Sequence, residues 1–221
     1  MTQDINVDPA SLPVDLFDVQ GNILRGYRKT KSRHLITEVK NADAARNWLA
    51  KVAAETPGDG PVITRGSDWG DHPPEVCFNI GVTCAGLHAL GVARGSTENF
   101  SDAYKQGMVA RAEKIGDWTT SSPDHWQPQF QDNDKLHLIL TLHADTPEAL
   151  DRYEAAIMSA GGDKAFTVLG RNEGAEFNKD VVHFGYRDNI SQPRFPGVSK
   201  PGRYDDQPTA PFGTVLLGYS A

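Results

Sequence analysis

The feature that most constrains the fold is a strictly alternating segment at residues 135–143. Leucine occupies every second position from Leu136 to Leu142, and histidine, isoleucine and threonine occupy the positions between. Successive side chains of a β-strand point to opposite faces, so this pattern predicts a strand with one strongly apolar face. Such a face is buried against a second layer of structure. The rest of the chain must therefore supply neighbouring strands and a covering layer.

Strands and helices are predicted on both sides of this segment. Further strands are predicted at residues 32–40, 62–64, 75–83, 165–169 and 181–184. Helices are predicted at residues 44–55 after the capping segment Asn41-Ala42-Asp43, at 85–91, at 101–115 with Ser101 as the cap, and after a Thr146 cap up to the Gly161-Gly162 pair. The order strand, helix, strand, insertion, strand, helix, strand is typical of a ferredoxin-like α+β unit. The sequence therefore predicts an antiparallel sheet with helices on one face.

The chain is predicted to hold one domain at residues 16–221, with a helical insertion at about residues 84–134. Residues 1–15 are polar and acidic, and we expect them to form a flexible N-terminal arm. The end of the insertion has no periodicity. Its residues His125, Trp126 and Phe130 either line the entrance to a ligand site or anchor the loop to the core.

Composition narrows the possible partners and the compartment. The formal net charge is −7 and Lys and Arg do not cluster, which argues against nucleic acid or an anionic membrane surface as partner. Residues 1–15 have neither the basic flank nor the apolar run of a signal or membrane segment. The two cysteines, Cys77 and Cys84, are expected to be buried thiols. So few sulfur atoms fit a reducing cytoplasm, which is where we expect the protein.

No metal site is predicted from the histidines of the alternating segment. His137 and His143 lie on the same face of the predicted strand. At ~3.3 Å per residue they are about 20 Å apart, too far for both to bind one metal ion.

The strongest candidate for chemistry is Asp188, within the segment His183–Pro193. The predicted strand at 181–184, the bend that Gly185 permits and the polar residues that follow deliver this carboxylate at a strand end. Functional groups are often placed there. The alternative is that Asp188 only caps its own turn by accepting a backbone N–H, and spacing alone does not separate the two.

Two segments resemble those of a known family. Gly185-Tyr186-Arg187-Asp188-Asn189, followed by Ile190-Ser191-Gln192-Pro193, resembles the Gly-x-x-Asp-Gly and Ile-Ser-Gln-Pro run of the dye-decolorizing haem peroxidases. Asn189 stands where that family has glycine. The segment 18–27, reading Asp-Val-Gln-Gly-Asn-Ile-Leu-Arg-Gly-Tyr, is similar to the family's N-terminal motif. Both occur in the family's order, so the resemblance spans most of the chain.

The resemblance implies a fold and a cofactor. The family joins two ferredoxin-like units into a dimeric α/β-barrel, and this chain resembles the first unit only, with 211–219 similar to the strand at the boundary between the halves. The second half supplies the His that ligates iron and the distal Arg. The implied cofactor is therefore haem b, with its iron ligated from outside this chain.

The resemblance also implies roles for individual residues. Asp188 would be the distal acid/base that moves a proton during hydrogen peroxide cleavage. Further residues are expected to contact haem or line the distal pocket, namely Gly185, Arg187, Asn189, Ile190, Ser191 and Gln192. The reducing substrate implied by the family is an aromatic or dye-like molecule.

Two functions from different classes follow. In the first, the chain is the N-terminal half or small subunit of a haem-dependent peroxidase, and a second-half chain completes it in an oligomer. In the second, it is a haem-free assembly or regulatory module with the same fold, which Asn189 and the unmatched second half motivate. A third origin is a fragment or proteolytic product of a longer enzyme.

Overall fold

The computed structural model describes residues 14–24, 26–54, 60–68, 74–177, 181–187, 194–195 and 206–216. The chain divides into two compact units. The first comprises Met1–Arg28, Thr64–Pro73 and Ala175–Ala221. The second comprises Lys29–Ile63 and Pro74–Gly174 and holds the sheet, apart from its last residue.

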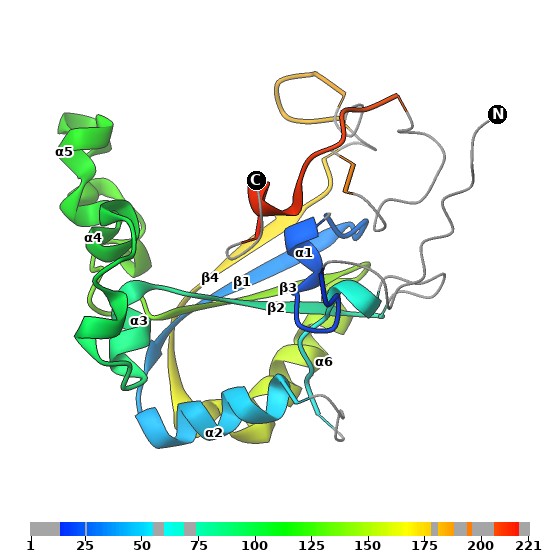
Figure 1. Cartoon of the computed structure of the whole chain (residues 1–221), viewed down its shortest axis with the longest axis horizontal. Helices are drawn as coiled ribbons and strands as arrows, with labels where there is room; N and C mark the ends of the chain where they lie inside the picture. The colour runs from blue at the N-terminus through cyan, green and yellow to red at the C-terminus, as the bar shows by residue number, and fades with distance from the viewer. Residues whose placement is uncertain are drawn as a thin grey trace. The chain divides into compact units, whose positions relative to one another are not determined.

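The sheet has four strands in the order β2-β3-β1-β4 (Figure 1). Their bounds are Lys31–Val39 for β1, Cys77–Val82 for β2, Leu138–Ala144 for β3 and Phe166–Ala175 for β4. β3 pairs antiparallel with both β1 and β2, and Leu140 lies between Leu35 and Ile80. With the helices that connect the strands, this interleaved order is the split βαβ arrangement of the ferredoxin-like unit. The predicted fold class is confirmed.

Two amphipathic helices cover one face of the sheet (Figure 1). They are α2 (Ala42–Val52) and α6 (Pro147–Ile157). Each begins at a predicted cap, because the Asn41 side chain accepts from the Ala44 N–H at 2.9 Å and Thr146 Oγ1 accepts from the Ala149 N–H at 3.3 Å. A π-helical turn (Met158–Gly162) and the short α7 (Asp163–Ala165) follow α6 and lead into β4.

The core lies between these helices and the sheet. The alternation predicted for β3 is confirmed, because Leu138, Leu140 and Leu142 are fully buried and the residues between them are partly exposed. Trp48 of α2 meets the rings of Phe78 and Phe166 edge to face, with ring centroids 6.2 and 5.1 Å apart.

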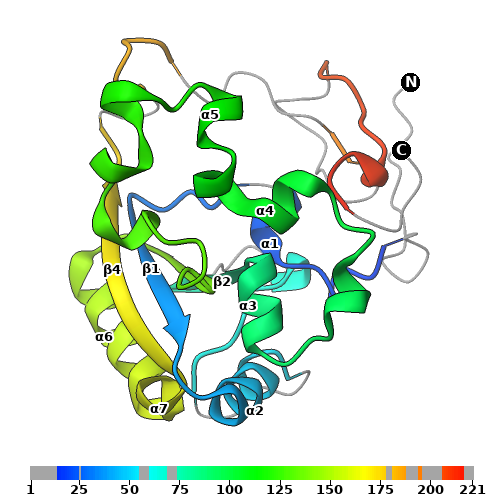
Figure 2. The same cartoon turned by 90° about the vertical axis from the view of Figure 1, so that its left-hand side faces the viewer.

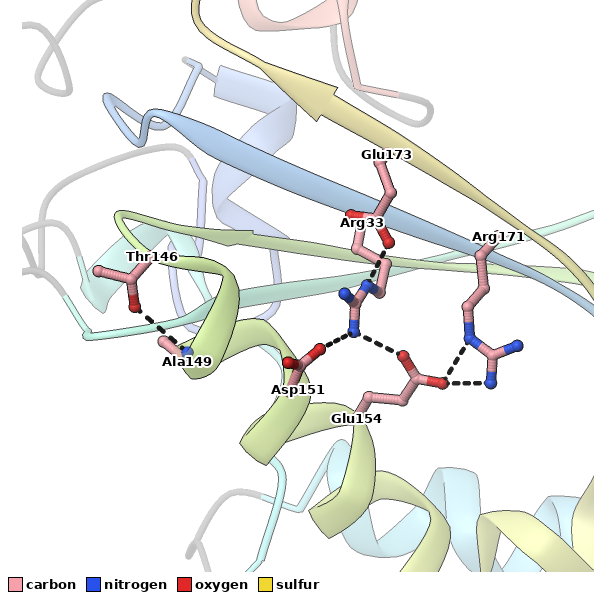
Figure 3. Close-up of polar contacts among 7 residues, drawn as sticks. All are labelled: Arg33, Thr146, Ala149, Asp151, Glu154, Arg171 and Glu173. Atoms are coloured by element: carbon pink, nitrogen blue, oxygen red, sulfur yellow. Dashed lines mark hydrogen bonds and ion pairs between the residues drawn. The ribbon is translucent and has the colours of Figure 1, made fainter.

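A cluster of five charged side chains joins the sheet to α6 (Figure 3). Arg33 of β1 contacts Glu173 of β4 at 2.6 Å and both Asp151 and Glu154 of α6 at 2.9 Å. Glu154 also accepts two hydrogen bonds from Arg171, at 2.8 and 2.5 Å. Burial alone would lower the pKa of Arg33, but its hydrogen bonds to these carboxylates outweigh burial and leave the pKa raised. The cluster fixes α6 across β1 and β4.

The insertion between β2 and β3 contains α3 (Cys84–Ala89), a 3₁₀ turn (Arg94–Thr97), α4 (Asp102–Ala110) and α5 (Ala112–Ile115). α4 and α5 lie away from α2 and α6 (Figures 1 and 2). The prediction of one helix at 101–115 is wrong at Gly107, whose φ of 72° and ψ of 178° interrupt it. The predicted cap, Ser101, is confirmed by its contact with the Tyr104 N–H.

The end of the insertion forms three 3₁₀ turns, at Thr119–Ser121, Pro123–His125 and Pro128–Phe130. Trp126 is partly buried and its Nε1 donates to the Ser121 carbonyl at 2.8 Å. This hydrogen bond joins two residues of the same loop, so the choice between anchoring the loop to the core and lining a ligand entrance stays a prediction.

Two other predictions on the sheet need correction. Residues 62–64 are not a strand, because the Ile63 N–H donates to the Val52 carbonyl at the end of α2 and the Val62 N–H donates to the Tyr153 hydroxyl. The strand predicted at 165–169 continues to Ala175 as β4. Gly170 and Glu173 have low strand propensity, so the sequence does not reveal this extension, in which ion pairs hold Arg171 to Glu154 and Glu173 to Arg33.

The first unit has its own small apolar cluster, made up of Val14, Val19, Phe195, Phe212 and Leu216. It also contains α1 (Gly21–Leu24) and 3₁₀ turns at Gly66–Asp68 and Phe212–Thr214. The strand expected at 211–219 is therefore wrong over Phe212–Thr214, and residues 217–221 lie outside the described part.

In the parts of the chain that the structure describes, no helix has the length and apolar character needed to cross a membrane.

Candidate functional site: an aromatic turn before Asp188

The residues that precede Asp188 form a tight turn from Val181 to Arg187. The Gly185 N–H donates to the Val182 carbonyl and the Val182 N–H donates to the Tyr186 carbonyl, both at 2.9 Å. Val181 and Arg187 form an antiparallel bridge that closes the turn. Gly185 has a φ of 82°, a left-handed conformation that favours glycine.

The turn corrects the strand predicted at 181–184. Aromatic and β-branched residues favour a strand, but here Val181 and Val182 are only partly buried and Phe184 is 86% exposed. Strand propensity reflects how well side chains fit a half-buried pleated surface, and composition alone does not reveal whether that surface exists. The bend that the sequence predicts at Gly185 is confirmed.

The turn presents an exposed aromatic surface. Phe184 is 86% exposed and Tyr186 is 75% exposed. Phe177, 61% exposed, stacks on the His183 ring with centroids 4.7 Å apart. Arg187 is also exposed. Exposed apolar groups that gather on a surface are typical of sites that meet a ligand or another polypeptide.

Of the predicted site residues, Gly185 and Arg187 lie in this turn. Asp188, Asn189, Ile190, Ser191 and Gln192 lie outside the described residues, so their roles stay predictions. The structure brings together Gly185, Arg187 and three aromatic side chains that the sequence did not select as ligand contacts. Only the exposure of these aromatic side chains marks them as candidate ligand contacts, and exposure cannot be read from the sequence.

The turn contains side chains of the types that would suit a haem. The described residues contain no group of three or more His, Cys, Asp or Glu side chains placed to hold a metal. His137 is committed to structure, because its Nδ1 accepts from the Val39 N–H at 2.9 Å and its Nε2 contacts the Asp134 carbonyl at 2.7 Å. The aromatic rings and Arg187 of the turn suit the apolar face and the propionates of a porphyrin.

A polar strip on the other face of the sheet was not selected from the sequence. His34 Nδ1 lies 3.1 Å from Thr141 Oγ1, and the His34 and His143 rings meet edge to face at 6.1 Å. Burial lowers the pKa of His34 and of His143, and the charge of His34 lowers the pKa of His143 further. Both rings are therefore held neutral at neutral pH. Thr141 and His143 alternate with the leucines of β3, and His34 of β1 is the register partner of Thr141, so all three lie opposite the apolar core.

Comparison with known proteins gives one consistent family. Residues 18–175 match the model of the DyP dimeric alpha+beta barrel domain. The chain is 30% identical over 220 residues to a dye-decolorizing peroxidase of Mycena epipterygia, which covers 97% of this chain and 39% of the relative. It is 29% identical over 206 residues to one of Exidia glandulosa, covering 91% of this chain and 38% of the relative.

Solved structures give the same family. A dye-decolorizing peroxidase variant in complex with cyanide has a TM-score of 0.76 and 27% identity, with coverage of 94% of this chain and 45% of that one. A fungal DyP-type peroxidase of Auricularia auricula-judae has a TM-score of 0.75 and 25% identity, with coverage of 95% and 44%. The chain thus spans about two-fifths of the length of the curated relatives it matches.

Proposed function

From the premise that this chain belongs to the dye-decolorizing peroxidase family, we propose that it is the N-terminal half or small subunit of a haem-dependent peroxidase. In this proposal a second-half polypeptide supplies the iron ligand and the distal Arg. The observation that carries the proposal is Gly185-Tyr186-Arg187-Asp188-Asn189, a five-residue motif in a chain whose residues 18–175 match the family's domain.

The proposed substrate is hydrogen peroxide, with an aromatic or dye-like molecule as reductant. Haem b, when bound, would supply the iron, and hydrogen peroxide would supply the oxidising equivalents. Asp188 accepts a proton from one peroxide oxygen and returns it to the other, so that water can leave. It must be ionised when peroxide arrives, and a nearby guanidinium favours that state whereas burial opposes it.

The neighbours of Asp188 position the cofactor in this proposal. Gly185 and the aromatic turn form an apolar edge for the porphyrin, and Arg187 pairs with a propionate. Asn189 and Ile190 would contact the ring, and Ser191 and Gln192 would hydrogen-bond peroxide or water. The buried thiols of Cys77 and Cys84 support a reducing cytoplasm as the compartment.

Turnover of an Asp188→Asn variant of the haem-bearing complex tests the proposed role. We expect the rate of peroxide-dependent dye oxidation to fall by about 10²–10⁴-fold, as on loss of a general acid/base, while the haem absorbance spectrum persists. Asp206→Asn, an exposed Asp in the same unit, is the matched control and should keep full turnover. Full activity of Asp188→Asn would remove Asp188 from the catalytic role.

A second candidate function is a haem-free assembly or regulatory module. Asn189 favours it, because a side chain replaces the glycine that lets backbone approach the ring closely. In that case the protein purified from its native source is a colourless homo-oligomer that stays colourless on addition of haem. A haem-bearing complex with a second polypeptide excludes this function.

A further inference from the structure

The insertion carries exposed apolar residues that belong to neither apolar cluster of the described part of the chain. None of the nine residues of α4, all of them described, is buried. We define the insertion surface as the exposed apolar residues of this region, Phe100, Tyr104, Met108, Ile115 and Trp118. Met108, Ile115 and Trp118 are 61%, 49% and 66% exposed. By contrast, α2 and α6 both bury an apolar side.

Polar contacts hold α4 in place. The Tyr104 hydroxyl donates to the Val82 carbonyl at 2.8 Å, at the end of β2. Lys105 Nζ donates to the Glu98 carbonyl at 3.0 Å, and the Ser101 side chain caps the first turn. Helices normally attach through an apolar side. Here polar contacts carry much of the attachment, and the apolar side remains exposed.

The kink that shapes the insertion surface is fixed. At Gly107, the Asn133 side chain donates to the Gln106 carbonyl at 3.0 Å and accepts from the Val109 N–H at 3.4 Å. Beyond the kink, backbone hydrogen bonds run from Arg111 to Met108 and from Ile115 to Arg111. Met108 belongs to α4 and Ile115 to α5, and the two short helices are joined at Arg111.

The geometry points to the insertion surface as the docking site for the second, haem-ligating half. This inference rests on the proposed function. The matched family domain, residues 18–175, includes the whole insertion, so this surface lies in a segment that the family shares. This chain covers only 39% of the length of the Mycena epipterygia relative. The remaining polypeptide of such relatives is the occupant to which we commit.

The chemistry of the surface suits such a partner. Trp and Met are enriched at the cores of protein interfaces, and buried aromatic anchors contribute most of the binding energy. Because Asn133 fixes the kink before binding, little backbone order has to be gained on association.

A titration with a charge-introducing double variant tests this inference. The second half is the remainder of the haem-bearing protein, produced as a separate chain, and its Kd for this chain is measured by calorimetry. Met108→Glu with Ile115→Glu should weaken binding at least about tenfold, because two carboxylates would be buried without partners. Ala50→Glu with Ala156→Glu, at exposed positions of α2 and α6, is the matched control and should change Kd less than about twofold.

The outcomes separate this inference from the proposed function. An unchanged Kd for the Met108→Glu, Ile115→Glu chain overturns the docking site and leaves the proposed function standing. If the wild-type chain does not bind the second half, the proposed function fails and the inference with it. If the double variant loses only self-association, the occupant is a second copy of this chain and the proposal is wrong. The urea midpoint of the variant, expected to stay within the control's range, shows that both chains are folded.

Discussion

At the residue scale, the ion pairs of Glu154 join side chains that are far apart in sequence. Glu154 has a side chain only 11% exposed and is held by Arg33, 121 residues away, and by Arg171. A carboxylate in such a position is stabilised only while its cations remain, because its own burial is unfavourable. The charge cluster of Figure 3 is therefore a set of mutually dependent groups.

Glu154→Gln tests this dependence. The substitution keeps the shape of the side chain but removes the charge that pairs with two guanidinium groups, so we expect the free energy of unfolding to fall by about 2 kcal/mol. The matched control is Glu75→Gln, which removes the same charge from the Arg152–Glu75 pair, whose side chains are 62% and 71% exposed. That variant should change stability by less than about 0.5 kcal/mol. Equal effects in urea unfolding would contradict the account.

The two histidines of the polar strip predict how stability depends on pH. Burial keeps the folded pKa of His34 and His143 below the unfolded value of about 6.5. As pH falls through that value the unfolded chain binds more protons, so the free energy of unfolding decreases. The neighbouring groups are Thr141 and Glu173, and the charge of Glu173 opposes the shift at His34 only in part.

The double variant His34→Gln, His143→Gln should therefore lose less stability between pH 7.5 and pH 5.5 than the wild-type chain. Urea midpoints at the two values measure the loss. His125→Gln, in an exposed 3₁₀ turn, is the control and should reproduce the wild-type drop. An identical drop in the double variant would show that these rings do not carry the pH dependence.

At the element scale, the start of α3 is fixed to the residues that precede β3. The Thr83 hydroxyl donates to the Leu136 carbonyl at 2.7 Å and accepts from the Gly86 N–H at 2.9 Å. A Cβ on Gly86 would meet the His137 carbonyl, with its carbon 2.8 Å away. The helix can approach this backbone only because Gly86 has no side chain.

Gly86→Ala should therefore lower the free energy of unfolding by about 2–3 kcal/mol, because the added methyl group clashes with backbone that cannot rotate away. Gly81→Ala is the control, since a Cβ at that exposed position meets nothing within 4 Å. It should be neutral within about 1 kcal/mol. Comparable losses in the two variants would mean that α3 does not depend on close approach at Gly86.

The sequence predicts elements well where the signal is local. The alternation of β3 and the caps at Asn41, Ser101 and Thr146 depend on residues within one turn or strand, and the structure confirms them. The break at Gly107 depends on Asn133, 26 positions away, and could not be read from the helix itself.

The candidate site was only partly predictable, for a related reason. The motif around Asp188 and the bend at Gly185 are visible in the sequence. The prediction of a strand at Val181–Phe184 is wrong, because composition does not distinguish aromatic residues that pack in a core from those that are exposed. The aromatic surface of the turn depends on what the rest of the fold leaves uncovered.

At the scale of the whole molecule, the chain corresponds to less than half of each relative it matches. It forms a complete ferredoxin-like sheet with its helical layer, and it spans about two-fifths of the relatives it matches. Two surfaces, the aromatic turn and the insertion surface, expose aromatic groups without contributing to its core. Both are explained if a second polypeptide with haem covers them.

The visible absorbance spectrum of the tagged chain purified from its native source, together with the mass of every polypeptide in the sample, tests this account most directly. We predict a haem Soret band in a complex that contains this sequence and a haem-ligating second half, with peroxide-dependent dye oxidation in the same fraction. A colourless chain that binds no second half and takes up no added haem would contradict it.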